Sequence, residues 1–353
     1  MKIIRLCTVL DFGGLEQRLV NISKVEDEHE WVFCALGNGG AAATQIEKNG
    51  KRVVLLETEF RIPSIKAIQR LVEFFKNERP DVVHTSGAEA NFHGIVAAKI
   101  AGVKRLVSEE IGIPNQKFLH KVLFSVLYRF PSYVLANALP VGKYLTEFNS
   151  VSLAKLRIIP NPVELSSSRT IKLSDDPEFH ILTVSRLTAV KNIDGILRVL
   201  ARLKKAGKAF KFTLIGDGDH FQGLKDLVDE LALKDLVDFK GYRGDPFSAV
   251  EAADLFILNS FTEGFSNALA EAMVAGIPCL ATNVGAAGDM IQENETGWLV
   301  QPGDDEGLFH KLRFIFSLDR EILAKVGQSG KESIRGKYSL QEHLHQLMEI
   351  YNG

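Results

Sequence analysis

The chain has 353 residues, of which 46% are apolar and 24% charged, a profile that fits a soluble globular enzyme and excludes a disordered or fibrous protein. Because one hydrophobic core rarely serves so many residues, we expect two domains. The net charge of −2 comes without a long run of one sign, so nothing indicates a nucleic-acid groove.

The three cysteines, Cys7, Cys34 and Cys279, each lie in an apolar run without the paired spacing of a zinc site. We expect buried free thiols in a reducing compartment. The apolar stretch near the N-terminus ends at Asp11, which is too short for a signal peptide, and no window reaches the roughly 18 apolar residues of a spanning helix. These features predict a cytoplasmic protein, at most peripheral to the inner face of a membrane.

Short β-rich segments alternate with helix-length segments, such as 64–77 and 90–101, through both halves of the chain. The first half has predicted strands at 3–9, 31–36, 52–56, 81–84, 105–107, 133–136 and 157–159. The second half has them at 179–185, 211–215, 237–239, 254–258 and 279–281. This alternation predicts an α/β protein with two Rossmann-like, doubly wound domains, each around a parallel sheet.

A cluster of helix-breaking and polar residues separates the halves, beginning with Pro160, Asn161 and Pro162 and continuing with serines at 166–168. We therefore predict domains at 1–164 and 165–335, and a terminal helix at 336–353 that packs back on the first domain. In open parallel sheets, ligands bind beyond the carboxyl ends of the strands. The site should lie on strand-to-helix loops, in a cleft between facing domains.

The most informative segment follows the predicted strand 254–258. Glu263 and Glu271 are eight residues apart, Gly264 permits close backbone approach, and Ser266 or Asn267 can cap a helix that carries Glu271. The N-terminus of that helix offers free N–H groups to an anion, and carboxylates suit the hydroxyls of a sugar or a ribose. The alternative is two solvated helix residues.

The order Glu263-Gly264-Phe265, then Glu271-Ala-Met, then Ala-Gly-Ile-Pro resembles the paired-glutamate signature of the family 4 glycosyltransferases, which have the GT-B fold. The resemblance implies that Glu263 contacts the donor sugar and Glu271 the ribose of a nucleotide diphosphate sugar. It also implies that the amides of Phe265, Ser266 and Asn267 lie near the sugar and the diphosphate.

Two cations follow the predicted strand 179–185. Arg186 and Lys191 could converge on a diphosphate and stabilise the charge that grows as a sugar leaves. The alternative is a solvated surface pair. In this position the segment resembles the family's Arg-Leu…Lys-Asn motif, which implies the diphosphate role and makes Arg186, Lys191 and Glu263 the predicted catalytic residues.

Two loops complete the predicted donor pocket. The resemblance implies that Gly216, Asp217 and Gly218 line the pocket, and that Tyr242 and Arg243 meet the nucleotide base. Without the resemblance, the segment with Gly216, Asp217 and Gly218 indicates only a turn. Asp217 and Asp219 also suggest a metal pair, but Arg186 and Lys191 already offer the charge that a metal would supply. We therefore predict no metal and no cofactor.

The first half carries the remaining candidates. Gly14 lies in a turn before a helix predicted from about Gln17, and the family's Gly-Gly-x-Glu loop implies that Gly14 approaches the diphosphate and Glu16 faces the acceptor. The alternative is a plain turn.

Further acceptor-side candidates are His84, Ser86 and Glu110. Ser86 stands where the family commonly has a second histidine. His84 alone also fits a satisfied residue at a strand end.

The segment 116–130 places Lys117, Lys121, Ser125 and Arg129 at four-residue steps on an otherwise apolar helix. A basic amphipathic helix can lie on an anionic membrane, which would suit a lipid-linked acceptor. The alternative is a core helix with a solvated edge.

The prediction is a retaining, metal-independent hexosyltransferase that moves a sugar, by analogy with the family from UDP, onto a glycan or lipid-linked acceptor in surface polysaccharide or glycoconjugate synthesis. The alternatives are a nucleotide-sugar epimerase of the same architecture and a nucleotide-sugar binding module without catalysis. We expect no nucleic-acid partner.

Overall fold

A computed structural model describes residues 1–11, 13–114, 116–163, 171–174 and 176–353. It divides the chain into two compact units, one of Met1–Pro162 with Leu340–Gly353 and one of Val163–Ser339. The boundary predicted between 164 and 165 lies outside the described residues.

The first unit is built on a seven-stranded sheet whose paired strands are all parallel, in the order β3-β2-β1-β4-β5-β6-β7. The strands are β1 (Lys2–Cys7), β2 (Glu30–Ala35), β3 (Arg52–Leu55), β4 (Val82–Ser86), β5 (Arg105–Glu110), β6 (Tyr133–Ala136) and β7 (Leu156–Ile158). The helices are α1 (Gly14–Ser23), α2 (Ala41–Lys48), α3 (Ile65–Glu78), α4 (Ala88–Ala101), α5 (Phe118–Leu127), α6 (Leu139–Asn149) and α13 (Leu340–Asn352). All seven predicted strands are present.

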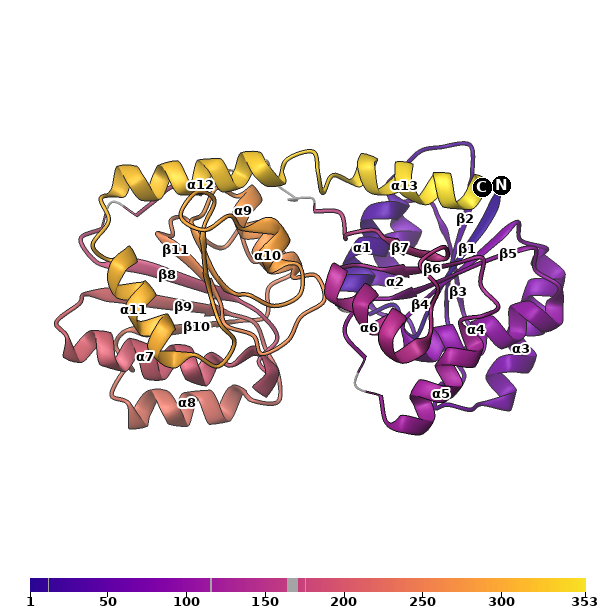
Figure 1. The fold of residues 1–353 in the computed structure, drawn as a ribbon, viewed down its shortest axis with the longest axis horizontal. Helices are drawn as coiled ribbons and strands as arrows, with labels where there is room; N and C mark the ends of the chain where they lie inside the picture. Colours follow the sequence, from indigo (N-terminus) through magenta and orange to yellow (C-terminus); the bar gives the residue numbers. More distant parts are fainter. Residues whose placement is uncertain (12, 115, 164–170, 175) are drawn as a thin grey trace. The chain divides into compact units, whose positions relative to one another are not determined.

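Side-chain alternation along the strands gives this sheet two buried faces. Ile3 and Cys7 of β1 pack in a core with Leu19 of α1 and with Leu347 and Ile350 of α13. The last helix of the chain therefore covers a face of the first sheet, as Figure 1 shows.

The second unit has six strands with parallel pairings, in the order β10-β9-β8-β11-β12-β13. They are β8 (Phe179–Val184), β9 (Phe210–Ile215), β10 (Val237–Gly241), β11 (Leu255–Leu258), β12 (Cys279–Thr282) and β13 (Trp298–Val300). The helices are α7 (Ile193–Lys205), α8 (Phe221–Glu230), α9 (Asn267–Val274), α10 (Ala287–Met290), α11 (Asp305–Ile315) and α12 (Arg320–Ile334). Helices lie on both faces of this sheet (Figure 1). The predicted α/β class with two doubly wound sheets is confirmed.

The differences from prediction are local. Strand β13, which has three residues, was not predicted. Helix α1 begins at Gly14 rather than near Gln17, so Gly14 is its first residue. The three cysteines are buried and unpaired. Among the helices that the structure describes, none combines the length and apolar content needed to cross a bilayer.

Candidate functional site

Four predicted segments follow neighbouring strands of the second unit. Arg186 comes after β8, Gly216 after β9, Tyr242 after β10 and Glu263 after β11. Because these strands are parallel, their carboxyl ends share one edge of the sheet, which is the edge where open α/β sheets bind ligands. The fold therefore gathers the predicted donor residues of this unit on one side.

Two glycines fix the contact between the first two loops. A Cβ atom at Gly216 would lie 1.8 Å from the carbonyl oxygen of Ser185, and one at Gly218 would lie 2.3 Å from that of Leu187. Between them, the Asp217 carbonyl accepts a hydrogen bond of 2.9 Å from the Leu187 N–H. A larger residue at Gly216 or Gly218 would push the loop after β9 away from the backbone on either side of Arg186.

Lys191 and Glu263 form an ion pair at the centre of this edge. Lys191 Nζ lies 2.5 Å from Glu263 Oε1, and Ser260 Oγ donates to the same oxygen at 2.6 Å. The two loops are also joined by Asn259 Nδ2, which donates to the Asn192 carbonyl at 3.1 Å. The predicted phosphate cation and the predicted sugar carboxylate are thus brought into contact, with both side chains partly accessible.

The helix N-terminus expected here is present. Ser266 caps α9 by accepting a hydrogen bond from the Leu269 N–H at 3.4 Å, and Gly264 and Phe265 before it are buried. Asn267 is the first helical residue. The first amides of α9 therefore face the loop that carries Glu263, where a helix N-terminus favours an anion.

Glu271 lies one turn into α9 and has an unusual environment. Burial, with a smaller contribution from the negative charge of Asp245, raises the pKa of the Glu271 carboxyl to about 8. In the described part of the chain, no hydrogen bond or ion pair reaches this carboxyl. Glu271 is half-buried by its accessible surface, so its carboxyl can be reached from solvent, and an unpaired carboxyl with a raised pKa is a candidate for binding a ligand.

The other donor-side candidates are accessible. Arg186 is exposed, and its guanidinium has no ion-pair partner within the described residues. Tyr242 and Arg243 are also exposed, whereas Asp217 Oδ1 accepts from the Gly218 N–H at 2.8 Å.

In the first unit, strand alternation separates the candidates. His84 and Ser86 lie on one face of the sheet, and Glu110 lies on the other, because Glu109 and Glu110 are consecutive residues of β5. Gly14 is exposed, and the half-exposed Glu16 folds back so that its Oε2 would lie 2.2 Å from a Cβ atom at Gly13. The four acceptor-side candidates, Glu16, His84, Ser86 and Glu110, therefore do not form one cluster.

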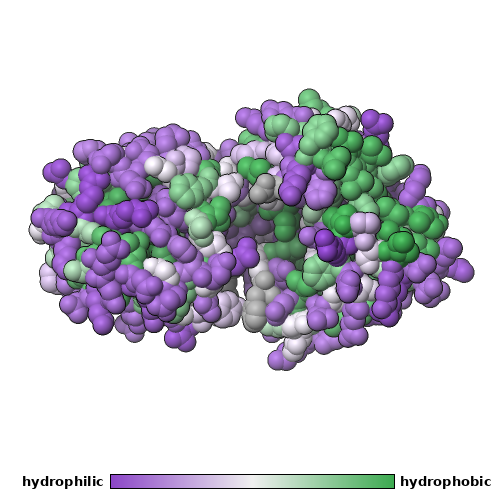
Figure 2. Space-filling view, turned by 90° about the horizontal axis from the view of Figure 1, so that it is seen from below, coloured by the Kyte–Doolittle hydropathy of each residue, from purple (hydrophilic) through white to green (hydrophobic). Residues whose placement is uncertain are grey.

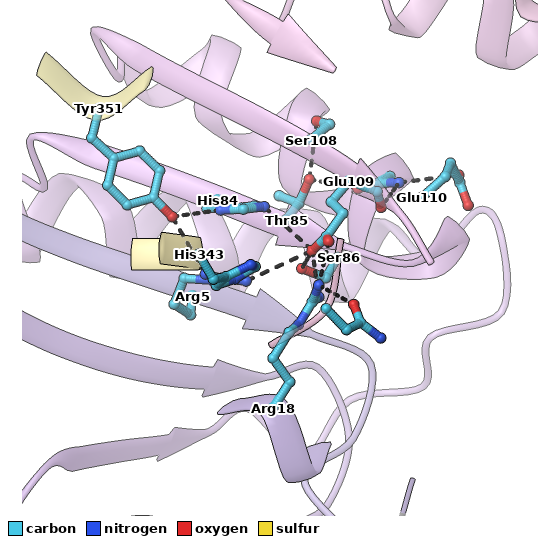
Figure 3. Close-up of polar contacts among 12 residues, drawn as sticks. Arg5, Arg18, His84, Thr85, Ser86, Ser108, Glu109, Glu110, His343 and Tyr351 are labelled. Carbon is cyan, nitrogen blue, oxygen red and sulfur yellow. Dashed lines mark hydrogen bonds and ion pairs between the residues drawn. The ribbon is translucent and has the colours of Figure 1, made fainter. Parts of the chain in front are cut away.

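His84 and Ser86 belong to a buried network centred on Glu109 (Figure 3). Arg18 pairs with both carboxylate oxygens of Glu109, at 2.5 and 2.6 Å, and Ser86 Oγ donates to Oε2 at 2.9 Å. His84 Nδ1 lies 2.5 Å from the Tyr351 hydroxyl of α13. His84 is fully buried, and Tyr351 satisfies its Nδ1, whereas its Nε2 lies 3.5 Å from Glu109 Oε2 and has no hydrogen-bond partner among the described residues. Its contacts are internal to the unit, which is the structural alternative to an acceptor contact.

The charges in this network follow from burial and from the arginines. Burial raises the pKa of Glu109, but Arg18 and the contact with His84 together outweigh burial and hold that pKa well below its usual range. Burial and the nearby Arg5 lower the pKa of His84 to about 3, and burial has the same effect on His343 of α13. The network thus contains two arginines, one carboxylate and neutral histidines at neutral pH.

Glu110 has a separate set of partners on the opposite face. Its Oε1 accepts hydrogen bonds from the Tyr128 hydroxyl and, at 3.1 Å, from Asn91 Nδ2. Burial raises the pKa of the Glu110 carboxyl to about 7, against the lowering effect of these two donors. The side chain is buried, so its contacts are internal to the unit.

Sequence reasoning missed Glu109 together with Arg5, Arg18, His343 and Tyr351. One signal was available, since a charged residue inside a predicted buried strand, such as Arg5 in β1, requires a partner. Its partners lie up to 346 positions away, so no local pattern identified them.

The predicted basic stripe of 116–130 is split, because Lys117 and Arg129 are exposed whereas Lys121 and Ser125 turn toward α6. Lys121 Nζ lies 4.1 Å from the centre of the Phe148 ring of α6, and Ser125 Oγ donates to the Phe148 carbonyl at 3.3 Å. The outer face of α5 is instead apolar, with Phe118 and Leu119 77% and 78% exposed. The core-helix alternative holds for one side of α5 only, where Phe124 and Leu127 are buried.

Two family profiles match the chain. Residues 12–167 match "Glycosyltransferase Family 4", and residues 166–333 match "Glycosyl transferases group 1". Between them they span nearly the whole sequence.

Curated relatives have names of the same kind. The putative colanic acid biosynthesis glycosyltransferase WcaL of Escherichia coli is 31% identical over 185 residues, which are 50% of this chain and 45% of WcaL. The chain thus covers about half the length of the relatives it matches first. A UDP-Gal:alpha-D-GlcNAc-diphosphoundecaprenol alpha-1,3-galactosyltransferase of Escherichia coli is 23% identical, covering 82% of this chain and 80% of that protein.

Among solved structures, HepE of Anabaena in complex with UDP and glucose superposes with a TM-score of 0.87 at 21% identity, covering 100% of both chains. This likeness shows that the fold is the same.

Proposed function

We propose, from the premise that the chain belongs to the family 4 glycosyltransferases, that it is a retaining enzyme that transfers a hexose from a UDP-sugar to a glycan or lipid-linked acceptor. The observation that carries the proposal is the grouping of Arg186, Lys191 and Glu263 at one sheet edge, beside the N-terminus of α9. Cations and amides suit a diphosphate, and a carboxylate suits sugar hydroxyls.

The proposed reaction breaks the bond between the anomeric carbon and the diphosphate oxygen. Arg186, Lys191 and the first amides of α9 would stabilise the charge that develops on that oxygen, while Glu263 holds the hydroxyls of the oxocarbenium-like sugar. The acceptor hydroxyl would then attack from the same face, and its proton would pass to the departing phosphate oxygen. No metal is required, because two side-chain cations supply the positive charge.

Glu271 would hold the ribose of the nucleotide. Its carboxyl has no partner of its own among the described residues, so two ribose hydroxyls would satisfy it without breaking an internal contact. Tyr242 and Arg243 would meet the base. This arrangement supports a nucleotide-bound donor over a free sugar.

The acceptor is proposed from the relatives. The galactosyltransferase named above acts on a diphosphoundecaprenol-linked sugar, and WcaL is named for colanic acid, a polysaccharide. We extend this to a lipid-linked acceptor in surface polysaccharide synthesis, with peripheral contact to the inner face of a membrane through residues 116–130.

The test is a panel of UDP- and GDP-sugars, assayed with chelator and without added metal, for binding and for release of the nucleoside diphosphate. Release with one donor above the spontaneous rate supports the proposal and identifies the sugar. Conversion to an isomeric nucleotide sugar would instead indicate the epimerase, and tight binding without release in the presence of acceptors would indicate a binding module.

A further inference from the structure

The outer face of α5 is an unusual surface for a folded domain. Phe118, Leu119, Val122 and Val126 fall within one arc of the helix, opposite Phe124 and Leu127, which are buried. About half of the large exposed hydrophobic side chains in the described residues lie between 111 and 153. Exposed apolar side chains that gather in this way mark an interaction site.

This surface extends beyond α5. Lys121 of α5 lies against the exposed Phe148 of α6, and Lys99 Nζ lies 5.5 Å from the centre of the exposed Phe130 ring. We define the apolar face as the six residues Phe118, Leu119, Val122, Val126, Phe130 and Phe148. Figure 2, which views the molecule from the side where α5 lies in Figure 1, shows hydrophobic side chains gathered on the first unit and a mostly hydrophilic second unit.

The segment of the chain that carries most of the apolar face is rich in cations. From residue 111 to residue 163 the sequence has six lysines and arginines but only one carboxylate, Glu147, although the whole chain has a net charge of −2. Lys117 and Arg129 flank α5, and both are exposed. A cationic border around apolar side chains is complementary to an anionic surface with an apolar interior.

We propose that the apolar face inserts into an anionic phospholipid bilayer, with Lys117 and Arg129 at the headgroups. A second copy of the chain fits less well, because a symmetric contact would place the same cations against each other. This inference refines the membrane contact in the proposed function, since it assigns insertion to the apolar face rather than to the basic stripe.

The placement has a consequence for the acceptor. Tyr128, which directly follows α5, donates to Glu110 at the end of β5, so the membrane-facing helix is anchored to the carboxyl edge of the first sheet. A lipid-linked acceptor held in the bilayer would therefore present its sugar next to the strand ends of the first unit.

The experiment is flotation of the full chain with vesicles, made either of phosphatidylcholine alone or with about one third phosphatidylglycerol. Binding to the anionic vesicles is expected, and it should weaken as salt is added. Phe118→Ser with Leu119→Ser should reduce it at least about tenfold, because both side chains lose apolar area that would enter the bilayer. Lys117→Gln with Arg129→Gln should abolish the preference for anionic vesicles.

Ile65→Ser is the matched control, since Ile65 is 73% exposed at the start of α3 in the same unit and should leave vesicle binding unchanged. Equal binding by the Phe118 and Leu119 variant would overturn the proposal. So would a wild-type dimer that this variant converts to a monomer in sedimentation. The flotation assay contains no donor or acceptor, and UDP binding is measured separately on the same variants. Failure of the insertion proposal is therefore distinguishable from failure of the proposed transferase function.

Discussion

The two units place charged side chains at the ends of parallel strands, but they satisfy those charges differently. In the first unit, Glu109 is buried and engaged by Arg18 and Ser86. In the second, Arg186 is exposed, and Glu271 is half-buried without a partner in the described residues. Polar groups that satisfy one another stabilise the fold, whereas polar groups left unsatisfied at a sheet edge are available to a ligand. The paired Glu109 carboxylate therefore serves the fold of the first unit, although buried nitrogens of the arginines and histidines around it lack hydrogen-bond partners among the described residues. The exposed Arg186 and the unpaired Glu271 of the second unit are available to a donor.

The largest expected effect tests the first half of this comparison. Arg18→Met leaves Glu109 buried without its main cation, which should cost the first unit about 3 to 5 kcal/mol of unfolding free energy. Urea unfolding can follow Trp31 fluorescence in a Trp298→Phe background, because each unit has one tryptophan. Arg52→Met is the control in the same unit, since the Arg52–Glu78 pair lies at the surface and should contribute less than about 1 kcal/mol. Equal losses in the two variants would contradict a special role for the buried pair.

The second effect concerns catalysis rather than stability. Arg186→Ala and Lys191→Ala should each lower the transfer rate about a hundredfold or more, because each removes a cation from the charge that develops on the diphosphate. Their unfolding midpoints should stay near that of Lys205→Ala, which removes an exposed lysine at the end of α7. If both site variants kept the wild-type rate, the proposed charge stabilisation would be wrong.

A pH dependence follows from Glu271. Its pKa of about 8 means that the free protein holds the carboxyl largely protonated at pH 7. Ribose hydroxyls donate to the ionised form, so binding favours loss of the proton, and affinity for UDP should rise roughly eightfold between pH 7 and pH 8.5. Calorimetric titration of wild type and Glu271→Gln measures this. The same rise in the glutamine variant would remove Glu271 from the ribose site.

The smallest effect sharpens the comparison within the donor site. Glu263→Gln removes the partner that holds Lys191, so UDP without a sugar should bind about threefold more tightly, by the scale of a partly exposed ion pair. Transfer should nevertheless fall, because the sugar hydroxyls lose the carboxylate. Ser260→Ala keeps the ion pair and should leave UDP affinity within about twofold. A weaker affinity for UDP in Glu263→Gln would contradict this competition.

The donor loops could be predicted from sequence because their information is local. Strand patterns placed Arg186 and Glu263 at strand ends, and the spacing to Glu271 placed it one turn into a capped helix. The Glu109 network could not be predicted in the same way, because Arg18 and Tyr351 reach it from distant helices. The four-residue spacing in 116–130 gave the wrong exposed face of α5, because the packing of α6 against Lys121 leaves no local mark.

The last helix also affects how the protein is synthesised. The second unit is continuous from Val163 to Ser339, whereas the first needs α13, whose Tyr351 contacts Arg5 and His84. Domains commonly fold in the order in which the ribosome makes them. Here synthesis of the first unit begins before that of the second but ends after it. Arg5 and Glu109 of a nascent chain therefore stay incompletely buried until the second unit and α13 have been translated.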